Sequence, residues 1–465
     1  MVQAPTPSSA LGVDLDQLLR IDRDHLIHPL SHPADHARPL VVVRGEGPDI
    51  VDGHGKRYFD ALSGLWNVNV GHGRSELGQV AAEQMSTLAF YNNYAGFVNV
   101  PAARLADKLI EIAYPNLGGV YFTTAGAESN ESAFKTARFF WKLQDKPDKV
   151  KIISRRWGYH GVTMAAASAT GLAVYHKMFA PLVPNFVQTV GPYRFRCELE
   201  DGRPRPCTNP SAHDYAAELE KTILEQDPET VAAIIAEPVQ GAGGVIVPPD
   251  DYWPKLRQIA DRHKVLLIAD EVITGFGRTG KWFALEHWNV QPDIVSFAKG
   301  VTSGYLPLGG IMVSRQIQNA INEAPLDMKF THAATYSGHP VCCAVGLANV
   351  AIIEREGLVD RAARVGAWFQ DQLQRQLAPL SHVGQVRGLG MMAAVEMVDP
   401  DASGSAYYDN AVALTGRIVG RCIDNGVLPR RINSTIVLAP PLISTEQQLS
   451  RLIEVLAEAI QAEAS

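Results

Sequence analysis

The sequence is poor in cysteine and has no excess of positive charge. Its 465 residues include five cysteines, an odd and small number that does not predict a disulfide framework. Lysine and arginine number 42 against 49 aspartates and glutamates, which gives a formal net charge of -7 and leaves no basic field for nucleic acid or an anionic membrane. These absences favour a small molecule as the partner.

Long hydrophobic runs are also missing from the chain. No segment approaches the length of a membrane span, and residues 1–11 carry neither the basic nor the apolar part of a signal peptide. We therefore expect a cytoplasmic protein without a membrane partner. With 46% hydrophobic residues, the chain can bury a large core that is divided between two lobes.

The cysteines do not follow the spacing of a metal site. Cys342 and Cys343 are adjacent in an apolar helical stretch and are expected to pack in the core. Cys197 and Cys207 lie in a polar, proline-rich segment, residues 191–213, which we interpret as a surface insertion. No second pair of zinc ligands follows at a suitable spacing, so we expect two free thiols here and no bound metal.

Two apolar segments of strand length end at residues with useful chemistry. Residues 265–269 run into Asp270, and residues 293–298 run into Lys299. Both are flanked by helical stretches, which predicts a parallel sheet that binds its ligand at the carboxyl ends of its strands. A lysine can form a Schiff base with a cofactor aldehyde, and a carboxylate can keep a pyridine nitrogen protonated. Either residue alone would more often be a cap or a solvated charge.

Two turns are candidates for cofactor contacts. Residues 124–128 form a turn of small residues between a strand and a helix, where free backbone N–H groups could hold a phosphate. Tyr159 follows Gly158 and could lie flat on a planar cofactor. A plain strand-to-helix turn and a surface turn are the alternatives, and without the lysine the first of them would be favoured.

A third glycine-rich run points to a different function. Residues 275–280 match G-x-G-x-x-G, the pattern of a dinucleotide-binding turn and hence of an NAD-dependent oxidoreductase. The glycines come several residues after the strand end and open no clear long helix, so we disfavour this interpretation.

Several motifs resemble the class III aminotransferases. Residues 267–278, followed by 296–300, resemble the signature of that family. Other stretches fit in the same order, and the match covers nearly the whole chain: residues 62–66, 124–130, 159–161, 237–241, 335–340 and 386–390. The chain is most similar to the ω-amino acid or amine:pyruvate group. The resemblance implies pyridoxal 5'-phosphate (PLP) and the α/β fold type I of aspartate aminotransferase, with a mainly parallel seven-stranded sheet in a large domain and a smaller α+β domain.

The resemblance also implies domain boundaries. Residues 1–61 would form an N-terminal arm and part of the small domain, residues 62–334 the large PLP-binding domain, and residues 335–465 the C-terminal small domain. The last third carries long amphipathic helices, and Ser444 with Gln447 predicts a capping box for the final one.

Catalytic and cofactor-binding roles follow from the resemblance residue by residue. Lys299 would be the Schiff-base lysine and proton shuttle, and Asp270 the partner of the pyridine nitrogen. Val272 and Tyr159 would pack on opposite faces of the ring. The other implied cofactor contacts are Gly126, Ala127, His160, Glu237 and Thr335.

Further residues would bind the phosphate and the substrates. Thr335 would reach the phosphate from the neighbouring subunit, so a homodimer or tetramer with shared active sites is implied. Trp66 and Tyr94 would wall the substrate pocket. Arg430 would receive the acceptor carboxylate, although the adjacent Arg431 is an alternative.

The resemblance implies that the protein is a PLP-dependent transaminase. It would move an amino group from an ω-amino acid or amine to a keto acid, expected to be pyruvate, by a ping-pong mechanism via pyridoxamine phosphate. β-Alanine, taurine, diamines and arylalkylamines are all compatible donors. The alternatives on the same fold are an aminomutase and a decarboxylase.

Overall fold

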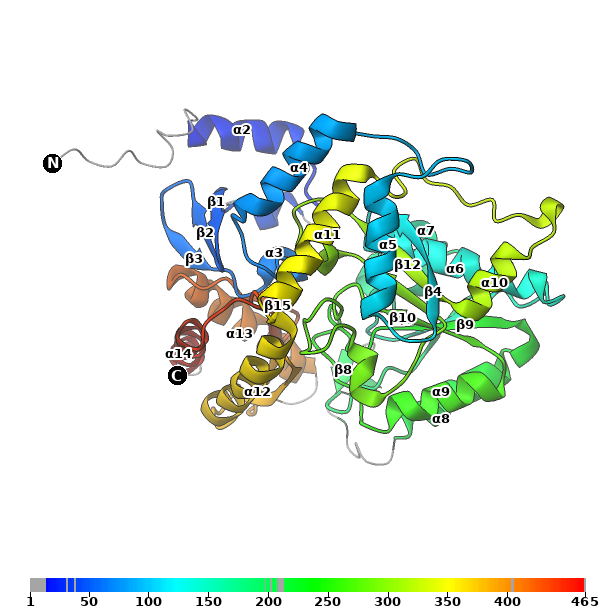
Figure 1. Ribbon diagram of the computed structural model, residues 1–465. Coiled ribbons are helices and arrows are strands. Elements are labelled where there is room, and N and C mark those ends of the chain that lie inside the picture. The colour runs from blue at the N-terminus through cyan, green and yellow to red at the C-terminus, as the bar shows by residue number, and fades with distance from the viewer. Residues whose placement is uncertain are drawn as a thin grey trace.

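A seven-stranded sheet forms the centre of the larger part of the molecule (Figure 1). The computed structural model describes residues 14–30, 32–36, 39–196, 198–200, 203–205, 207, 213–402 and 405–463. The sheet order is β4-β12-β11-β10-β9-β5-β6. Its strands are β4 (Leu117–Thr123), β5 (Lys151–Arg155), β6 (Phe186–Thr189), β9 (Val231–Ala236), β10 (Leu266–Asp270), β11 (Ile294–Phe297) and β12 (Gly309–Ser314).

The sheet is mainly parallel, as predicted. Strand β12 runs antiparallel to both of its neighbours, while the other pairings are parallel. Every residue of β9 and β10 is buried, because helices cover both faces and the central strands therefore need a continuous apolar run.

Helices pack against the two faces of this sheet. One apolar cluster joins α6 to the sheet, and the other joins the sheet to α5, α8, α9 and α11. The helices around the sheet are α5 (Val100–Ile112), α6 (Gly126–Leu143), α7 (Met164–Ala169), α8 (Tyr215–Glu225), α9 (Tyr252–Arg262), α10 (Arg315–Asn322) and α11 (Pro340–Arg355).

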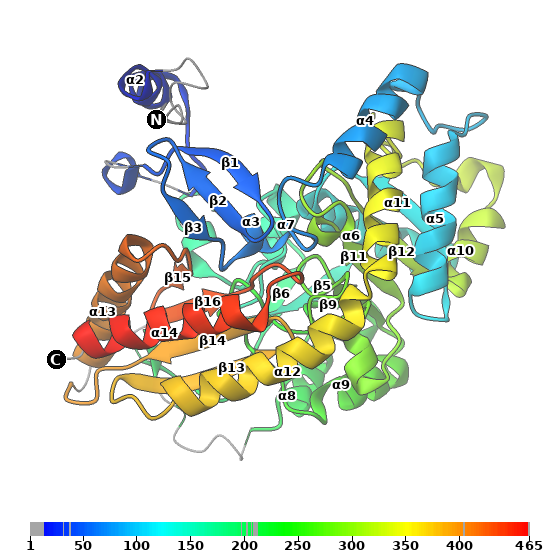
Figure 2. The ribbon, with the colours of Figure 1, turned by 60° about the vertical axis from the view of Figure 1, so that its left-hand side comes forward.

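Two smaller antiparallel sheets lie beside the large one (Figure 2). The first is three-stranded, and the second has the order β13-β14-β16-β15 and packs with helices α12, α13 and α14. Their elements are β1 (Val42–Glu46), β2 (Asp49–Asp52), β3 (Arg57–Phe59), α12 (Leu358–Leu377), β13 (Val383–Leu389), β14 (Met392–Met397), α13 (Ser405–Asp424), β15 (Arg430–Ile432), β16 (Thr435–Leu438) and α14 (Glu446–Glu463).

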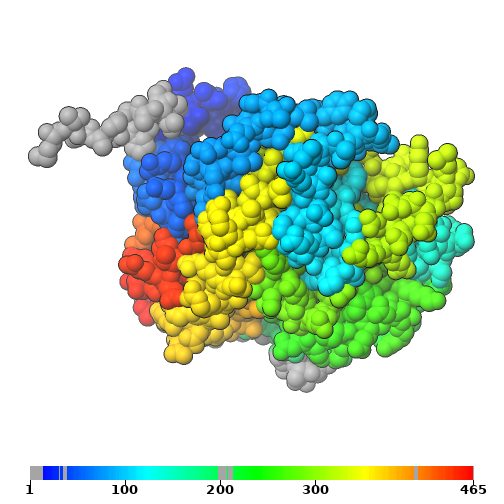
Figure 3. All heavy atoms as spheres, viewed as in Figure 1, coloured from blue at the N-terminus to red at the C-terminus, as the bar shows by residue number. Residues whose placement is uncertain are grey.

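The N-terminal and C-terminal parts of the chain are in direct contact. Phe59 of β3 bridges Val427, and its N–H donates to the carbonyl of Gly426 at 2.9 Å. Figure 3 shows the blue N-terminal and the orange-to-red C-terminal segments adjacent on one side of the molecule. The remaining described elements are α2 (Leu15–His25), α3 (Ser63–Trp66), α4 (Ser75–Leu88), β7 (Glu198–Glu200) and β8 (Arg203–Arg205).

The cysteine predictions have a mixed outcome. Cys342 and Cys343 are free and buried in α11, as predicted. Cys207 is disulfide-bonded, so the prediction of a free thiol there is wrong; Cys197 lies outside the described residues. The β7–β8 hairpin reverses the chain and brings Cys207 beside Phe195, whose carbonyl accepts its N–H at 3.0 Å. The number of cysteines alone does not show which of them a hairpin brings close enough to be bonded.

Two other sequence interpretations need correction. The segment from residue 191 is not purely a surface insertion, because Tyr193 and Arg196 are buried and Arg196 Nε donates to Glu396 of β14 at 2.8 Å. The capping box of α14 is formed one position later than predicted. Thr445 Oγ1 accepts the N–H of Gln448 at 3.2 Å, and Gln448 Oε1 accepts the N–H of Thr445 at 2.9 Å.

Membrane-spanning helices and clusters of metal-binding side chains are both absent from the described residues. No helix in the described part of the chain is long and apolar enough to cross a membrane. No group of three or more histidine, cysteine, aspartate or glutamate side chains in those residues is arranged to hold a metal ion.

Candidate functional site

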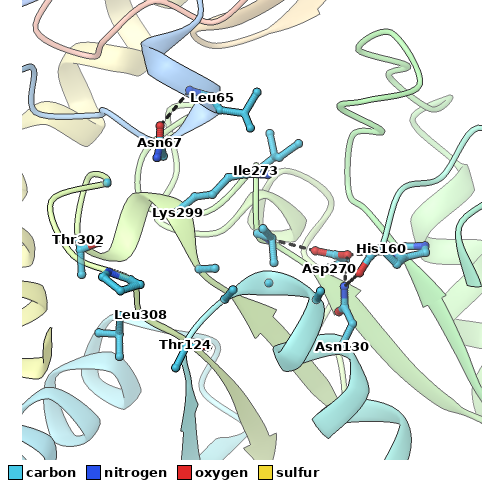
Figure 4. Close-up of a pocket in the computed structure, with 18 of the residues that line it drawn as sticks. Leu65, Asn67, Thr124, Asn130, His160, Asp270, Ile273, Lys299, Thr302 and Leu308 are labelled. Atoms are coloured by element: carbon cyan, nitrogen blue, oxygen red, sulfur yellow. Dashed lines mark hydrogen bonds and ion pairs between the residues drawn. The ribbon is translucent and has the colours of Figure 1, made fainter. Parts of the chain in front are cut away.

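A cavity of about 520 Å³ opens at the carboxyl ends of the central strands (Figure 4). Its volume is typical of a pocket for a small molecule or cofactor. Eight of the predicted cofactor-binding residues line it together: Gly126, Ala127, Tyr159, His160, Glu237, Asp270, Val272 and Lys299.

Asp270 is the last residue of β10 and is almost completely buried. Its Oδ2 atom accepts hydrogen bonds from Asn130 Nδ2 and from His160 Nδ1, each at 2.8 Å. Its Oδ1 atom accepts the N–H of Val272 at 3.2 Å. Figure 4 shows Asn130 and His160 grouped around this carboxylate. One oxygen is thus fixed by two side chains, and the other has acceptor capacity left for a ligand.

Lys299 lies just after β11 and faces the same cavity. Its backbone φ is +45°, a left-handed conformation that costs a non-glycine residue free energy and is found most often at functional sites. Burial lowers the pKa of its ammonium to about 8, against opposing effects of Asp270 and Glu237, and Arg430 lowers it further. A share of this amine is therefore neutral near neutral pH and can act as a nucleophile or base.

The first turn of α6 forms one wall of the cavity. Its N-cap, Ala125, has no side-chain acceptor for the N–H groups at the helix start, so these donors and the helix dipole can bind an anion. A Cβ on Gly126 would lie 2.8 Å from Val272 Cγ1, so only glycine fits this close approach. Ala125 and Ala127 contribute no hydroxyl groups, and phosphate binding here depends on the backbone.

Glu237 is a second buried carboxylate at the site. Its two oxygens accept the N–H of Tyr159 at 3.0 Å and the N–H of Gly241 at 2.8 Å. Burial raises the pKa of this carboxyl, and Asp270 raises it further, while His160 opposes the shift. Glu237 thereby holds the Tyr159 turn and the glycine-rich loop after β9 in place.

The predicted substrate residues Trp66 and Tyr94 do not line the cavity. Trp66 is buried in an apolar cluster behind the cavity, and its neighbours Leu65 and Asn67 reach the lining instead. Tyr94 and Thr335 are exposed on the surface and do not line the cavity.

Arg430 and Arg431 have different surroundings. The positive charge of Arg430 lowers the pKa of Lys299 and opposes the burial that raises the pKa of Tyr159 to about 12. Arg431 packs toward α13. A Cβ atom added to Gly416 of that helix would lie only 2.6 Å from Arg431 Nη1. Arg430 does not line the cavity, but its charge acts on Lys299 and Tyr159, which do.

The glycine-rich run after Asp270 does not form a dinucleotide-binding turn. Residues 271–281 pass through turns and a bend and open no long helix. Arg278 of this run is buried and donates through Nη2 to Asn69 Oδ1 at 2.7 Å and to Ser63 Oγ at 3.2 Å. The run therefore fixes the segment that carries Leu65 and Asn67 into the cavity.

Some lining residues were not identified from the sequence. Asn130 is one helical turn beyond Gly126, a spacing that places both on one face of α6, and its polar side chain in a buried position was an available signal. Leu65 and Asn67 had no such signal, because Ser63, Gly64 and Trp66 all have positive φ and redirect the side chains between them.

The residues present fit PLP. A carboxylate with a free acceptor position suits a protonated pyridine nitrogen, a helix start without a side-chain cap suits a phosphate, and an amine of lowered pKa suits an aldehyde. These three groups occur in one cavity of suitable volume.

Comparison with known proteins gives a consistent result. The family model for class III aminotransferases matches residues 30–460. The putrescine–pyruvate aminotransferase of Pseudomonas aeruginosa is 38% identical over 436 residues, or 93% of each chain. An (S)-enantioselective omega-transaminase from Thermomicrobium roseum has a TM-score of 0.90 at 44% identity, covering 97% of this chain and 100% of its own. An amine transaminase from an uncultivated Pseudomonas species, solved in its PLP-bound form, has a TM-score of 0.88 at 39% identity, covering 94% and 98%.

Proposed function

Because the chain belongs to the class III aminotransferases and is a PLP-dependent transaminase, we propose that it moves amino groups from an amine or ω-amino acid to pyruvate. One observation carries this proposal: Lys299 and Asp270 line one cavity whose other walls are largely apolar, and the positive charge of Arg430, which lies outside that lining, acts on Lys299. The names of the relatives, an omega-transaminase and a putrescine–pyruvate aminotransferase, support the same donor and acceptor.

The side chains have separate roles in this reaction. Bound PLP supplies an electron sink for the charge that remains when the donor loses its α-proton. Asp270 would stabilise the proton on the pyridine nitrogen, and Asn130 and His160 hold its carboxylate in position through Oδ2. Lys299 Nζ would take up the α-proton of the donor and hold it for its return. The donor product leaves before pyruvate binds, so the two half-reactions follow a ping-pong order.

We infer substrate selection from the contrast between the apolar lining of the cavity and the positive charge of Arg430. Leu65, Val272 and Ile273 line the cavity with apolar groups, which suit the body of an amine without an α-carboxylate. Arg430 offers a planar pair of donors for the carboxylate of pyruvate. A donor and an acceptor of different polarity can therefore use the same cavity in turn.

We also propose that the active sites are shared within a homodimer or a higher oligomer. Thr335 is exposed and does not line its own cavity, so it is available to the phosphate of a neighbouring subunit. Exposed aromatic residues gather near it, with Phe90 in edge-to-face contact with Tyr336 and Tyr91 with Phe97. Light scattering on the purified protein should give at least twice the 50.6 kDa of one chain.

The function is tested by visible spectroscopy of the purified holoenzyme. An amine donor such as putrescine should change the cofactor absorbance, and pyruvate added after removal of the donor should restore it. 2-Oxoglutarate serves as the comparison acceptor and should restore it more slowly. A faster recovery with 2-oxoglutarate would reassign the acceptor.

The alternative activities on this fold give different results in the same experiment. A decarboxylase would release carbon dioxide, and an aminomutase would isomerise its substrate, in both cases without any keto acid. Sustained turnover of the donor without an acceptor would therefore contradict the proposed transamination.

A further inference from the structure

His332 connects two elements that are predicted to handle the cofactor phosphate. Its ring stacks on Tyr121 of β4, with 5.0 Å between ring centroids and 29° between planes. Its Nε2 atom lies 2.9 Å from Ser132 Oγ, and its Nδ1 atom lies 2.8 Å from Lys135 Nζ. Ser132 and Lys135 belong to α6, so the segment around His332 is attached to the helix whose first turn forms the anion site.

The two hydrogen bonds of the His332 ring can run in only one direction. An ammonium group donates and does not accept, so Lys135 Nζ donates to His332 Nδ1. The ring is then neutral, and its Nε2–H donates to Ser132 Oγ. Ser132 in turn donates to the carbonyl of Glu128 at 2.8 Å. This chain of hydrogen bonds ends in the first turn of α6, next to Gly126 and Ala127.

The other end of the connection lies close to Thr335. His332 precedes Thr335 by three residues, and the exposed Thr335 is proposed to reach the phosphate of the neighbouring subunit. The backbone between them contains Ala333 and Ala334, which have no polar side chains to fix the segment. His332 is therefore the polar side chain that anchors this stretch to the helix.

Protonation of His332 would break the connection. The charged groups that act on the ring are Lys135, Glu128 and Glu131, all on α6, and Tyr121 lies against its face. Burial lowers the pKa of His332 and Lys135 lowers it further, whereas the two glutamates oppose the shift. If Nδ1 gained a proton, it and the ammonium of Lys135 would both be hydrogen-bond donors. Neither group could then accept from the other.

We propose that His332 is a positioning residue for cofactor binding, whose neutral ring fixes the Thr335 segment against the start of α6. Acidification should then speed the release of PLP, because it breaks the hydrogen bond between His332 and Lys135. The inference rests on the proposed function, because it presupposes both bound PLP and the role of Thr335. His332 has no catalytic role in this inference and acts only through the position of the Thr335 segment.

The test measures the rate of PLP release from the holoenzyme after gel filtration, followed by the cofactor absorbance between pH 5 and pH 8. The variants are H332Q, K135Q and the matched control K142Q, an exposed lysine on the same helix. Wild type and K142Q should release PLP about tenfold faster at pH 5.5 than K135Q does. The Gln amide in K135Q can rotate and accept from a protonated Nδ1, so its release should change little with acid.

The H332Q variant provides a second and independent comparison. It should release PLP about tenfold faster than K142Q at pH 8, and it should lose the additional release in acid. Superimposable pH profiles of wild type and K135Q would overturn the inference, and so would wild-type retention in H332Q. Because K135Q changes a surface residue, its result does not depend on whether H332Q folds.

The failure of the proposed function would be distinguishable from the failure of this inference. If wild type showed no PLP absorbance at any pH, the transaminase assignment itself would be contradicted. If wild type bound PLP and all four proteins released it alike, only the role of His332 would be wrong.

Discussion

A buried lysine and a half-buried lysine lie at opposite ends of the large sheet. Burial lowers the pKa of both Lys149 and Lys299 to about 8. Lys149 lies at the amino ends of the strands and donates to the carbonyls of Pro228, Val231 and Lys264 at 2.7 to 3.1 Å. Lys299 lies at the carboxyl ends, and among the described residues no hydrogen-bond acceptor is found for its Nζ atom.

The comparison shows that a lowered pKa does not by itself mark a reactive lysine. The ammonium of Lys149 has three donors and three acceptors, lies 4.7 Å from the centre of the Trp141 ring and is closed off from solvent. Lys299 has a strained backbone and opens into a cavity with Asp270 and Glu237. Unsatisfied hydrogen-bonding capacity and access to a ligand distinguish the second lysine from the first.

The largest expected effect separates the two lysines directly. In K299M, transamination should fall by at least about 10⁴-fold, since both the nucleophile and the proton carrier are lost. The unfolding midpoint should be unchanged or higher, because a buried charge is removed. Initial rates with an amine and pyruvate, together with urea unfolding, measure both quantities. Retention of more than a hundredth of the wild-type rate would contradict the assigned role.

The charge beside Lys299 is the next feature to test. D270N should reduce turnover by about 10²- to 10³-fold, because a neutral amide cannot stabilise a proton on the pyridine nitrogen. PLP should still bind, since the first turn of α6 is unchanged. Single-turnover measurements with the donor isolate the proton-transfer step. A near-normal rate would mean that Asp270 only holds His160 and Asn130 in position.

The opposite result is expected for Lys149. K149M should lower the free energy of unfolding by about 2 to 4 kcal/mol, because one buried and two partly buried carbonyls lose their donor. Activity per folded molecule should remain at the wild-type value. Urea unfolding and active-site titration test both statements, and a loss of activity without a loss of stability would invalidate the comparison.

The same substitution has a predictable dependence on pH. The pKa of Lys149 is about 8 in the folded protein and near its ordinary value in the unfolded chain, so the unfolded state binds more protons between pH 8 and pH 10. The wild type should therefore gain stability relative to K149M as pH rises through this range. An advantage that shrinks with rising pH would contradict the direction of the shift.

The smallest effect concerns the two adjacent arginines near the reactive lysine. R430A should raise the KM for pyruvate by about tenfold, the loss expected for a charge-assisted hydrogen bond. R431A is the matched control, and it should leave this KM unchanged because its side chain packs toward α13. The reverse result would assign the carboxylate to Arg431.

The sequence predicted the features that depend on local pattern. The continuous apolar runs of β10 and β11 required burial on both faces, and the position of Asp270 and Lys299 at strand ends followed from strand length. The acceptors of Lys149 come from separate segments of the chain, so no local signal could identify them. Trp66 was misplaced for a different reason, because consecutive residues with positive φ break the regular alternation of side chains.

The antiparallel strand β12 has a consequence for how the chain is made. Thr123 of β4, just before the anion-binding turn, pairs with Gly309 of β12, which is translated nearly two hundred residues later. At a translation rate of about 5 to 20 residues per second, β4 is synthesised between about 10 and 40 s before its partner strand. During that time its edge is open to wrong pairing, and the N-terminal strand that ends at Phe59 waits longer still for Val427. The sheet that carries the active site is thus completed only after β12 has been translated.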